Sequence, residues 1–176
     1  PFSKKLKNEK NYDILEYHWN DYEKLKNDYK YVDKFCSKLI VDLAKTLNVF
    51  HKKEYSQKFW EILIGNWIHN FSFMIFDRWE ILNKLDNNNT NYNIVFKNYS
   101  DHEMIVQTLD EFNNLFFLND YNSYLFYKII KHRYENEKKF LITFKNVKPS
   151  EFLFLKNKFE KIDKNLKSKI FDLYKF

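Results

Sequence analysis

Residues 55–80 read YSQKFWEILIGNWIHNFSFMIFDRWE and hold residue types that are scarce elsewhere in the chain, including the only glycine and three of the four tryptophans. Apolar side chains fall on almost every side of a helix drawn through them, which predicts a central helix covered on most sides. Ser56 can cap this helix, with Tyr55 and Trp60 forming a hydrophobic staple. Gly65 in a helix interior costs about 0.8–1 kcal/mol relative to alanine. A close backbone approach or a bend would explain that cost; a neutral substitution is the alternative.

The composition allows one sizeable core. The chain has 176 residues, of which 44% are hydrophobic and 20% aromatic, so one domain or part of one is expected. Its formal net charge is +6. Lysines alternate with acidic residues, as over residues 21–30, which is typical of a solvated helical face with i,i+4 pairs. This pattern favours ordinary solvated charge over a nucleic-acid footprint, and no nucleic-acid partner is predicted.

The number of cysteines and the length of the apolar runs indicate in which cellular compartment the protein works. With one cysteine, Cys36, the chain can form no intramolecular disulfide, and the helical pattern around Cys36 indicates a buried, inert thiol. The apolar run at 71–76 is far shorter than the roughly 20 residues that span a bilayer. We therefore expect a cytoplasmic protein, with association at the inner face of the membrane as a further expectation.

The elements around residues 55–80 are expected in the following order. A short strand at 12–18 leads into a long amphipathic helix from Asp21 to about Val49. The later elements are a strand at 92–97, a helix at 105–118, a helix from Asp120, a strand at 139–145 and an amphipathic helix at 152–174. The expected fold class is an α-rich α/β fold, with long packed helices and two or three short strands. We expect a first domain at 1–147 and a C-terminal helical segment at 148–176.

Several kinds of chemistry are not supported by the sequence. One glycine cannot build a dinucleotide fingerprint or a P-loop, and no nucleophile elbow surrounds any serine. The five histidines lack the pairing and the cysteine partners of a zinc site, so no metal site is predicted.

Two polar clusters lie in apolar surroundings. Asp77 and Arg78 end the apolar helix, where an unpaired charge would cost several kcal/mol. Adjacent helical residues point about 100° apart, so we expect the two to bind separate partners. Arg78 is either a buried tether or a group that faces an anion or a sugar. His18 and Trp19 are expected on a strand-to-helix turn, where an indole could stack on a sugar and an imidazole could exchange hydrogen bonds. The alternative is that Trp19 packs the helix onto the core and the backbone satisfies His18.

These clusters belong to a longer series of motifs. The motifs are LEYHWNDYEKL at 15–25, DYKY at 28–31, His51, Tyr55-Ser56, FWEILIG at 59–65, Trp67 and FDRW at 76–79. Together they resemble a family of bacterial transferases found in O-antigen and other surface-polysaccharide gene clusters. The similarity continues through 92–96 and 115–120 and fades after about Tyr134.

The resemblance implies a glycosyltransferase of the two-Rossmann-lobe (GT-B-like) kind, of which this chain would be the N-terminal, acceptor-side lobe, incomplete at its start. The nucleotide-sugar donor would bind mostly in a missing C-terminal lobe, so this chain alone would hold no cofactor and be inactive. The acceptor would be a glycan or a lipid-linked glycan. The family pattern often places a proline after the glycine of the central helix, where this chain has Asn66.

The candidate site residues follow from the two clusters and the resemblance. His18 and Asp21 are the candidate catalytic residues, because a base on the acceptor side would deprotonate the acceptor hydroxyl. The candidate substrate-binding residues are Trp19, Trp67, Asp77 and Arg78. The alternative function is a non-catalytic helical protein-interaction module with exposed aromatic side chains. Single-stranded nucleic-acid binding on stacked aromatics is a third option, and it predicts salt-sensitive affinity for oligonucleotides.

Overall fold

The computed structural model describes residues 15–86, 91–106, 108–134 and 140–145. The chain divides into two compact units, residues 1–81 and 82–176. The expected helix at 152–174, the segment 148–176 that contains it, and residues 12–14 of the first expected strand lie outside the described residues.

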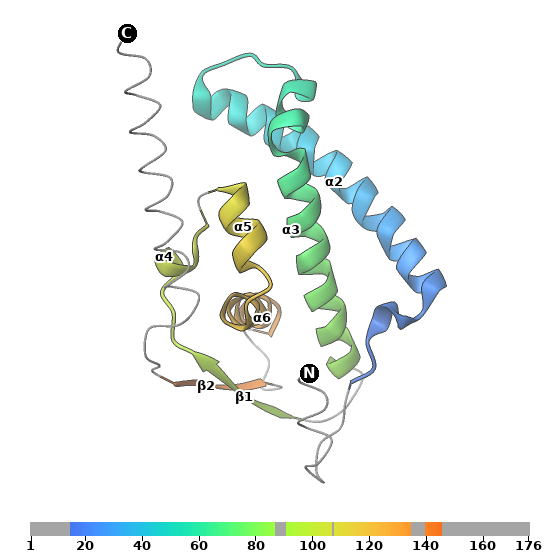
Figure 1. Cartoon of the computed structure of the whole chain (residues 1–176), viewed down its shortest axis with the longest axis vertical. Helices are drawn as coiled ribbons and strands as arrows, with labels where there is room; N and C mark the ends of the chain where they lie inside the picture. Colours follow the sequence, from blue (N-terminus) through green and yellow to red (C-terminus); the bar gives the residue numbers. More distant parts are fainter. Residues whose placement is uncertain (1–14, 87–90, 107, 135–139, 146–176) are drawn as a thin grey trace. The chain divides into compact units, whose positions relative to one another are not determined.

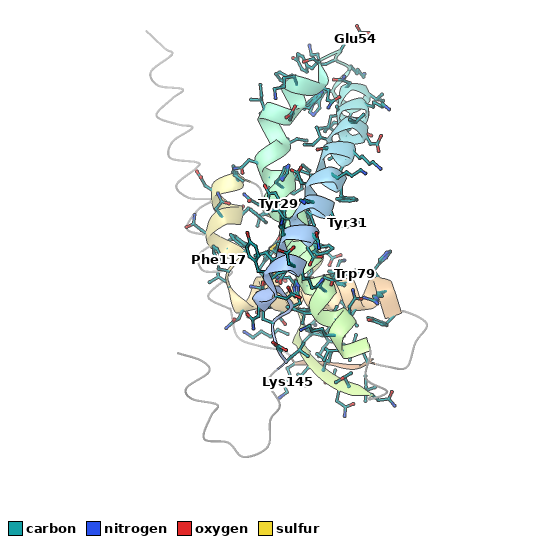
Figure 2. The ribbon with its side chains drawn as sticks, turned by 90° about the vertical axis from the view of Figure 1, so that its right-hand side faces the viewer. Tyr29, Tyr31, Glu54, Trp79, Phe117 and Lys145 are labelled. Carbon is teal, nitrogen blue, oxygen red and sulfur yellow. The ribbon has the colours of Figure 1, made fainter. Side chains whose placement is uncertain are left out.

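The first unit is built on a helical hairpin (Figure 1). The 3-10 turn η1 (His18–Asn20) leads into α2 (Tyr22–His51), and a short connection leads into α3 (Gln57–Asp86), whose last turn belongs to the second unit. Figure 2 shows Glu54 at the connecting end of the hairpin and Trp79 well along α3. The strand expected to run to His18 is wrong for its described part. Residues 15–17 are not in a strand, and His18 lies in the 3-10 turn, where its side chain bonds α3.

Both ends of α2 are fixed by hydrogen bonds. The Asp21 carboxylate accepts hydrogen bonds from the backbone N–H groups of Glu23 and Lys24, so Asp21 is the N-cap. At the other end Lys52 adopts the left-handed conformation, with φ 53° and ψ 48°. The Lys53 N–H bonds the carbonyl of Asn48, which completes a Schellman motif. Glycine usually occupies the position that Lys52 holds here.

The start of α3 confirms the expected cap and staple. The Ser56 hydroxyl accepts a hydrogen bond from the Phe59 N–H at 3.2 Å. The rings of Tyr55 and Trp60 meet edge to face with centroids 5.8 Å apart. The Trp60 indole N–H also donates to the Asn48 side chain at 2.8 Å, which ties the helix start to the end of α2. Local sequence thus determines where the hairpin turns.

The first unit buries one face of α3 against α2. The contact is centred on Val32, Cys36, Ile40 and Ile68, and Cys36 is fully buried as expected. The prediction that α3 is covered on most sides is wrong in its first half, because Ile62 is 75% exposed and Leu63 63% exposed. A helix in a two-helix hairpin can bury only the face turned to its partner.

Gly65 lies in an unbroken stretch of α3. The helix runs from Gln57 to Asp86 through both Gly65 and Asn66, so neither residue interrupts it. A Cβ at position 65 would meet Ile40 at 3.8 Å and Glu61 at 3.7 Å, which is ordinary van der Waals contact. The structure therefore shows no close backbone approach at Gly65.

The second unit contains a parallel strand pair joined by helices. Strand β1 (Tyr92–Lys97) pairs with β2 (Phe140–Lys145), in a register that joins Tyr92 to Phe140. The chain between them forms α4 (Asp101–Met104), α5 (Leu109–Leu115) and α6 (Asn119–Tyr134). Parallel strands need such a crossover. Tyr127 of α6 contacts Phe96 and Phe144, one on each strand, so α6 packs on the pair. Both strands confirm expectations, and the fold is α-rich α/β.

The helix expected at 105–118 is confirmed only over Leu109–Leu115, as α5, and the separate helix α4 ends before residue 105. Ser100 and Glu103 form a capping box that starts α4. The Thr108 hydroxyl accepts a hydrogen bond from the Glu111 N–H and starts α5. Each cap fixes an extended residue at a helix start, so the backbone cannot continue as one helix through residue 108.

Candidate functional site

A polar cluster links η1 and the start of α2 to the final turns of α3. At its centre is His18, which is only 2% exposed. The His18 Nε2 lies 2.9 Å from the Asp77 Oδ1, although the residues are 59 positions apart in sequence. One alternative was that backbone groups form the hydrogen bonds of His18. In the structure a carboxylate, that of Asp77, bonds Nε2 instead. This contact fixes the turn before α2 against α3.

Asp77 also accepts hydrogen bonds from other neighbours. Its Oδ2 lies 2.7 Å from the Arg78 Nη1, and the Tyr17 hydroxyl donates to the same carboxylate. The prediction that Asp77 and Arg78 bind separate partners and not each other is therefore wrong, because the two side chains bond each other. Asp77 also binds a separate partner, His18. The long guanidinium side chain folds back along the helix, where it also reaches the carbonyl of Met74 at 3.4 Å.

The other ring nitrogen of His18 faces a second carboxylate. His18 Nδ1 lies 3.9 Å from the Asp28 Oδ2, and it has no hydrogen-bond partner among the residues that the structure describes. The same Asp28 oxygen accepts from the Trp19 indole at 3.0 Å and from the Lys24 ammonium at 2.8 Å. Lys24 also bonds Glu80 at 2.7 Å. Lys24 therefore bridges α2 and α3 between two carboxylates.

Burial and charge shift the proton affinity of two groups in this cluster. Partial burial, a hydrogen bond to Asp77 and the negative charge of Asp77 raise the pKa of Tyr17 to about 12. Burial lowers the pKa of Lys24, but hydrogen bonds to Asp28 and Glu80 outweigh it, so the pKa is raised overall. Both groups therefore stay protonated at neutral pH, the tyrosine as a hydrogen-bond donor and the lysine as a cation.

One set of ligand-type side chains meets here. One atom each from His18, Asp28 and Glu80 lies within 4.8 Å of the others, as the ligands of a divalent cation would. The Lys24 ammonium already bonds both carboxylates of this set. A metal ion would have to displace that ammonium, so Asp28 and Glu80 form a carboxylate pair bridged by Lys24.

The structure brings together four of the six predicted site residues: His18, Trp19, Asp77 and Arg78. The fifth, Asp21, is the exposed N-cap of α2, which accounts for its carboxylate. The sixth, Trp67, stacks on Phe71 and packs against the hairpin core. Ten residues along α3 separate Trp67 from Asp77, about 15 Å at the helical rise. Trp67 therefore does not share the His18 cluster.

Sequence reasoning missed four members of the cluster: Tyr17, Lys24, Asp28 and Glu80. The i,i+4 pair of Lys24 and Asp28 was visible, but it was interpreted as part of a solvated face. In the structure both side chains are largely enclosed, with 32% and 14% of their surface exposed. The available signal was their place on the same helical face as Val32, one to two turns away, which directs them at α3.

The comparison with protein families supplies a reaction class for the chain. The model of the LIC12162 family transferase matches residues 2–176. The chain belongs to this family. No curated protein and no solved structure matches it. No helix within the described ranges is both long enough and apolar enough to cross a bilayer. Membership makes the chain part of a transferase family, and the His18 cluster is the candidate site for its chemistry.

Proposed function

We propose that this transferase moves a sugar from a nucleotide-sugar to a hydroxyl of a surface-polysaccharide acceptor, and that this chain forms the acceptor side. The donor would bind mostly in a further lobe of a longer protein. The observation that carries the proposal is the enclosed His18, whose Nε2 pairs with Asp77 while Nδ1 has no hydrogen-bond partner among the described residues. A buried polar atom without a partner costs about 1–3 kcal/mol, a cost that catalytic groups often carry.

The pair has the layout of a general base and its orienting carboxylate. With the proton on Nε2, His18 donates to Asp77, and Nδ1 presents a lone pair. Nδ1 takes the acceptor hydroxyl proton once the side chains that enclose the ring move aside, because the His18 side chain is 0% exposed in this structure. The acceptor oxygen bonds to the anomeric carbon, and the bond from that carbon to the phosphate oxygen breaks. The nucleoside diphosphate leaves with the electron pair. Asp77 then stabilises the imidazolium that forms.

Side chains at the rim suit a sugar acceptor. Tyr17 is 43% exposed, and its ring meets that of Trp19 edge to face at 5.9 Å. Aromatic faces of this kind stack on sugar rings. Lys24 and Arg78 supply donors to sugar hydroxyls or to an acceptor phosphate, since each keeps part of its side chain exposed. Asp21 remains a second candidate base, at the exposed start of α2.

The experiment is donor turnover by the full-length protein. The protein is incubated with a panel of nucleotide-sugars and a glycan acceptor, and release of nucleoside diphosphate and the mass of the product are measured. His18→Gln should lower kcat by about 100-fold or more with little change in KM, because general bases contribute roughly 10²–10⁴-fold. Asp21→Asn keeps the helix cap and tests the second candidate base.

The outcomes separate the two candidate bases and the two function classes. Loss of turnover in His18→Gln with retention in Asp21→Asn assigns the base to His18, and the reverse result assigns it to Asp21. Full turnover in both variants removes both residues from the mechanism. A folded wild-type protein that consumes no donor in the panel would refute glycosyl transfer and leave the non-catalytic interaction module as the better description.

A further inference from the structure

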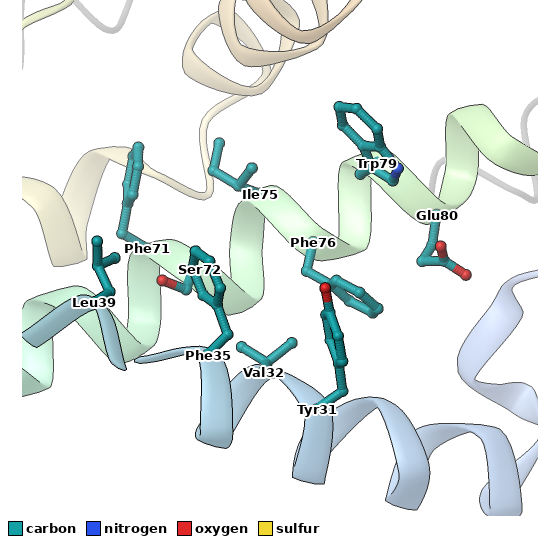
Figure 3. Close-up of a pocket in the computed structure, with 10 residues that line it drawn as sticks. All are labelled: Tyr31, Val32, Phe35, Leu39, Phe71, Ser72, Ile75, Phe76, Trp79 and Glu80. Carbon is teal, nitrogen blue, oxygen red and sulfur yellow. The ribbon is translucent and has the colours of Figure 1, made fainter. Parts of the chain in front are cut away.

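An open apolar groove runs along the first unit between α2 and α3 (Figure 3). Its volume is about 820 Å³. Aromatic and aliphatic side chains form its walls, with Ser72 as a small polar interruption; the main ones are Tyr31, Phe35, Leu39, Phe71, Phe76 and Trp79. Small-molecule pockets usually measure about 300–1,000 Å³ and are mostly apolar, so this groove has the size and lining of one.

The groove has two unlike ends. Figure 3 shows Leu39 and Phe71 at one end and Trp79 and Glu80 at the other. Residues 71 and 80 are nine positions apart on α3, about 14 Å along the helix. The first end is apolar, whereas Glu80 at the second end carries a carboxylate. A ligand lying along the groove would therefore have an apolar body and one polar end.

The polar end leads directly into the His18 cluster. Glu80 bonds the Lys24 ammonium at 2.7 Å, and that ammonium bonds Asp28 at 2.8 Å. The Asp28 carboxylate lies 3.9 Å from the His18 Nδ1. On α2, Asp28 is one turn before Tyr31, which faces Phe76 in the groove with ring centroids 5.7 Å apart. Glu80 thus belongs to both the groove and the cluster within the first unit.

We propose that this groove binds the hydrocarbon chain of a lipid-linked acceptor and so places the hydroxyl-bearing head of that acceptor at His18. The identity of the polar head rests on the proposed glycosyl transfer. Binding of the hydrocarbon tail follows from the groove alone and does not depend on that function. An amphiphile joins one apolar chain to one polar head, which is the same order as the groove and the cluster. The carboxylates of Asp28 and Glu80 would accept hydrogen bonds from sugar hydroxyls, and Lys24 would donate to them.

The binding test uses the full-length protein and alkyl glucosides with hexyl, octyl and decyl chains, kept below their micelle-forming concentrations. Dissociation constants are measured by calorimetry, with glucose as the ligand that has no tail. Each added methylene that reaches the groove should tighten binding by up to about fourfold. Glucose should bind far more weakly than decyl glucoside. Equal affinity across the chain lengths would overturn the proposal.

Substitutions in the groove wall test whether the hydrocarbon tail binds there. Phe35 is 48% exposed, so Phe35→Glu puts a charge on the groove wall without burying it in the core. This change should weaken decyl glucoside binding about tenfold or more. Phe35→Leu, which keeps the position apolar, should bind decyl glucoside nearly as well as the wild type. Ser72→Phe fills the groove without adding charge and should weaken binding similarly. The matched control is Phe50→Glu, on the same helix at a 78% exposed position outside the groove, which should leave binding unchanged. Equal loss in the control would overturn the assignment.

A measurement of sugar transfer separates this proposal from the proposed function. With a long-chain acceptor, Phe35→Glu should lower kcat/KM about tenfold through KM, whereas transfer to an acceptor without a chain should be unchanged. Normal transfer to both acceptors in Phe35→Glu would refute the groove and leave the function standing. Chain-dependent binding without any transfer would support the groove and refute the function. Conversion of a dimer to a monomer by Phe35→Glu would show that a second copy occupies the groove, which refutes the proposal.

Discussion

Replacement of Asp77 by alanine should be among the most damaging single changes to the first unit. The Asp77 carboxylate is 10% exposed and accepts hydrogen bonds from His18, Arg78 and Tyr17. Removing one partner of a buried ion pair costs about 3–5 kcal/mol, because the remaining groups stay buried without compensation. Asp77→Asn keeps an oxygen in place for His18 and should cost about 1–2 kcal/mol, the difference between charged and neutral hydrogen bonds.

The measurement is urea unfolding followed by tryptophan fluorescence. All four tryptophans lie within residues 1–81, so their emission reports on the first unit alone. The matched control is Asp33→Ala, which also removes an aspartate next to a histidine. Asp33 lies 3.8 Å from His69, but the two side chains are 51% and 34% exposed. An exposed pair of this kind should contribute less than about 1 kcal/mol.

A double-mutant cycle isolates the contact itself. His18→Ala, Asp77→Ala and the double variant should show a coupling free energy of about 0.5–3 kcal/mol between the two side chains. If Asp77→Ala costs no more than Asp33→Ala, or if the coupling is zero, the buried link from the first turn to α3 does not exist in solution, and the proposed base and its orienting carboxylate are lost with it.

The remaining predictions concern the backbone and the pH dependence of stability. Lys52→Gly should raise the unfolding free energy by about 0.5–1 kcal/mol in urea titrations, since the left-handed conformation is costly for lysine; an unchanged or lower midpoint would contradict the cap. Gly65→Ala should stabilise the hairpin by about 0.8–1 kcal/mol, because the new methyl would lie 3.8 Å from Ile40 in ordinary contact; destabilisation would point to a close approach that the structure does not show. The pKa values of Tyr17 and Tyr121 are raised from 10.0 to about 12, chiefly by burial, with nearby carboxylates adding to the effect. The folded chain therefore holds protons that the unfolded chain loses, so stability should fall as pH rises from about 10 to 12, and absorbance titration of phenolate in the folded protein should show the late ionisation.

Local rules predicted much of the secondary structure. The two long helices begin where local signals predict, because caps act within one turn of the chain. Asp21 starts α2, and Ser56 with the staple of Tyr55 and Trp60 starts α3. The same kind of rule also misled, since the apolar periodicity across 105–118 concealed the cap at Thr108. Where two local signals compete, periodicity alone does not show which one the backbone follows.

The sequence by itself determined membership of a transferase family, the helix-rich class and the two unusual polar pairs, His18-Trp19 and Asp77-Arg78. Only the tertiary structure decided that these pairs meet, because the antiparallel turn of the hairpin brings Asp77 to His18 across 59 positions. It also decided that Lys24 and Asp28 belong with them, and that the apolar face above them is an open groove. Side-chain contacts across a hairpin depend on the rotation of each helix about its axis, which packing sets and which no short motif records.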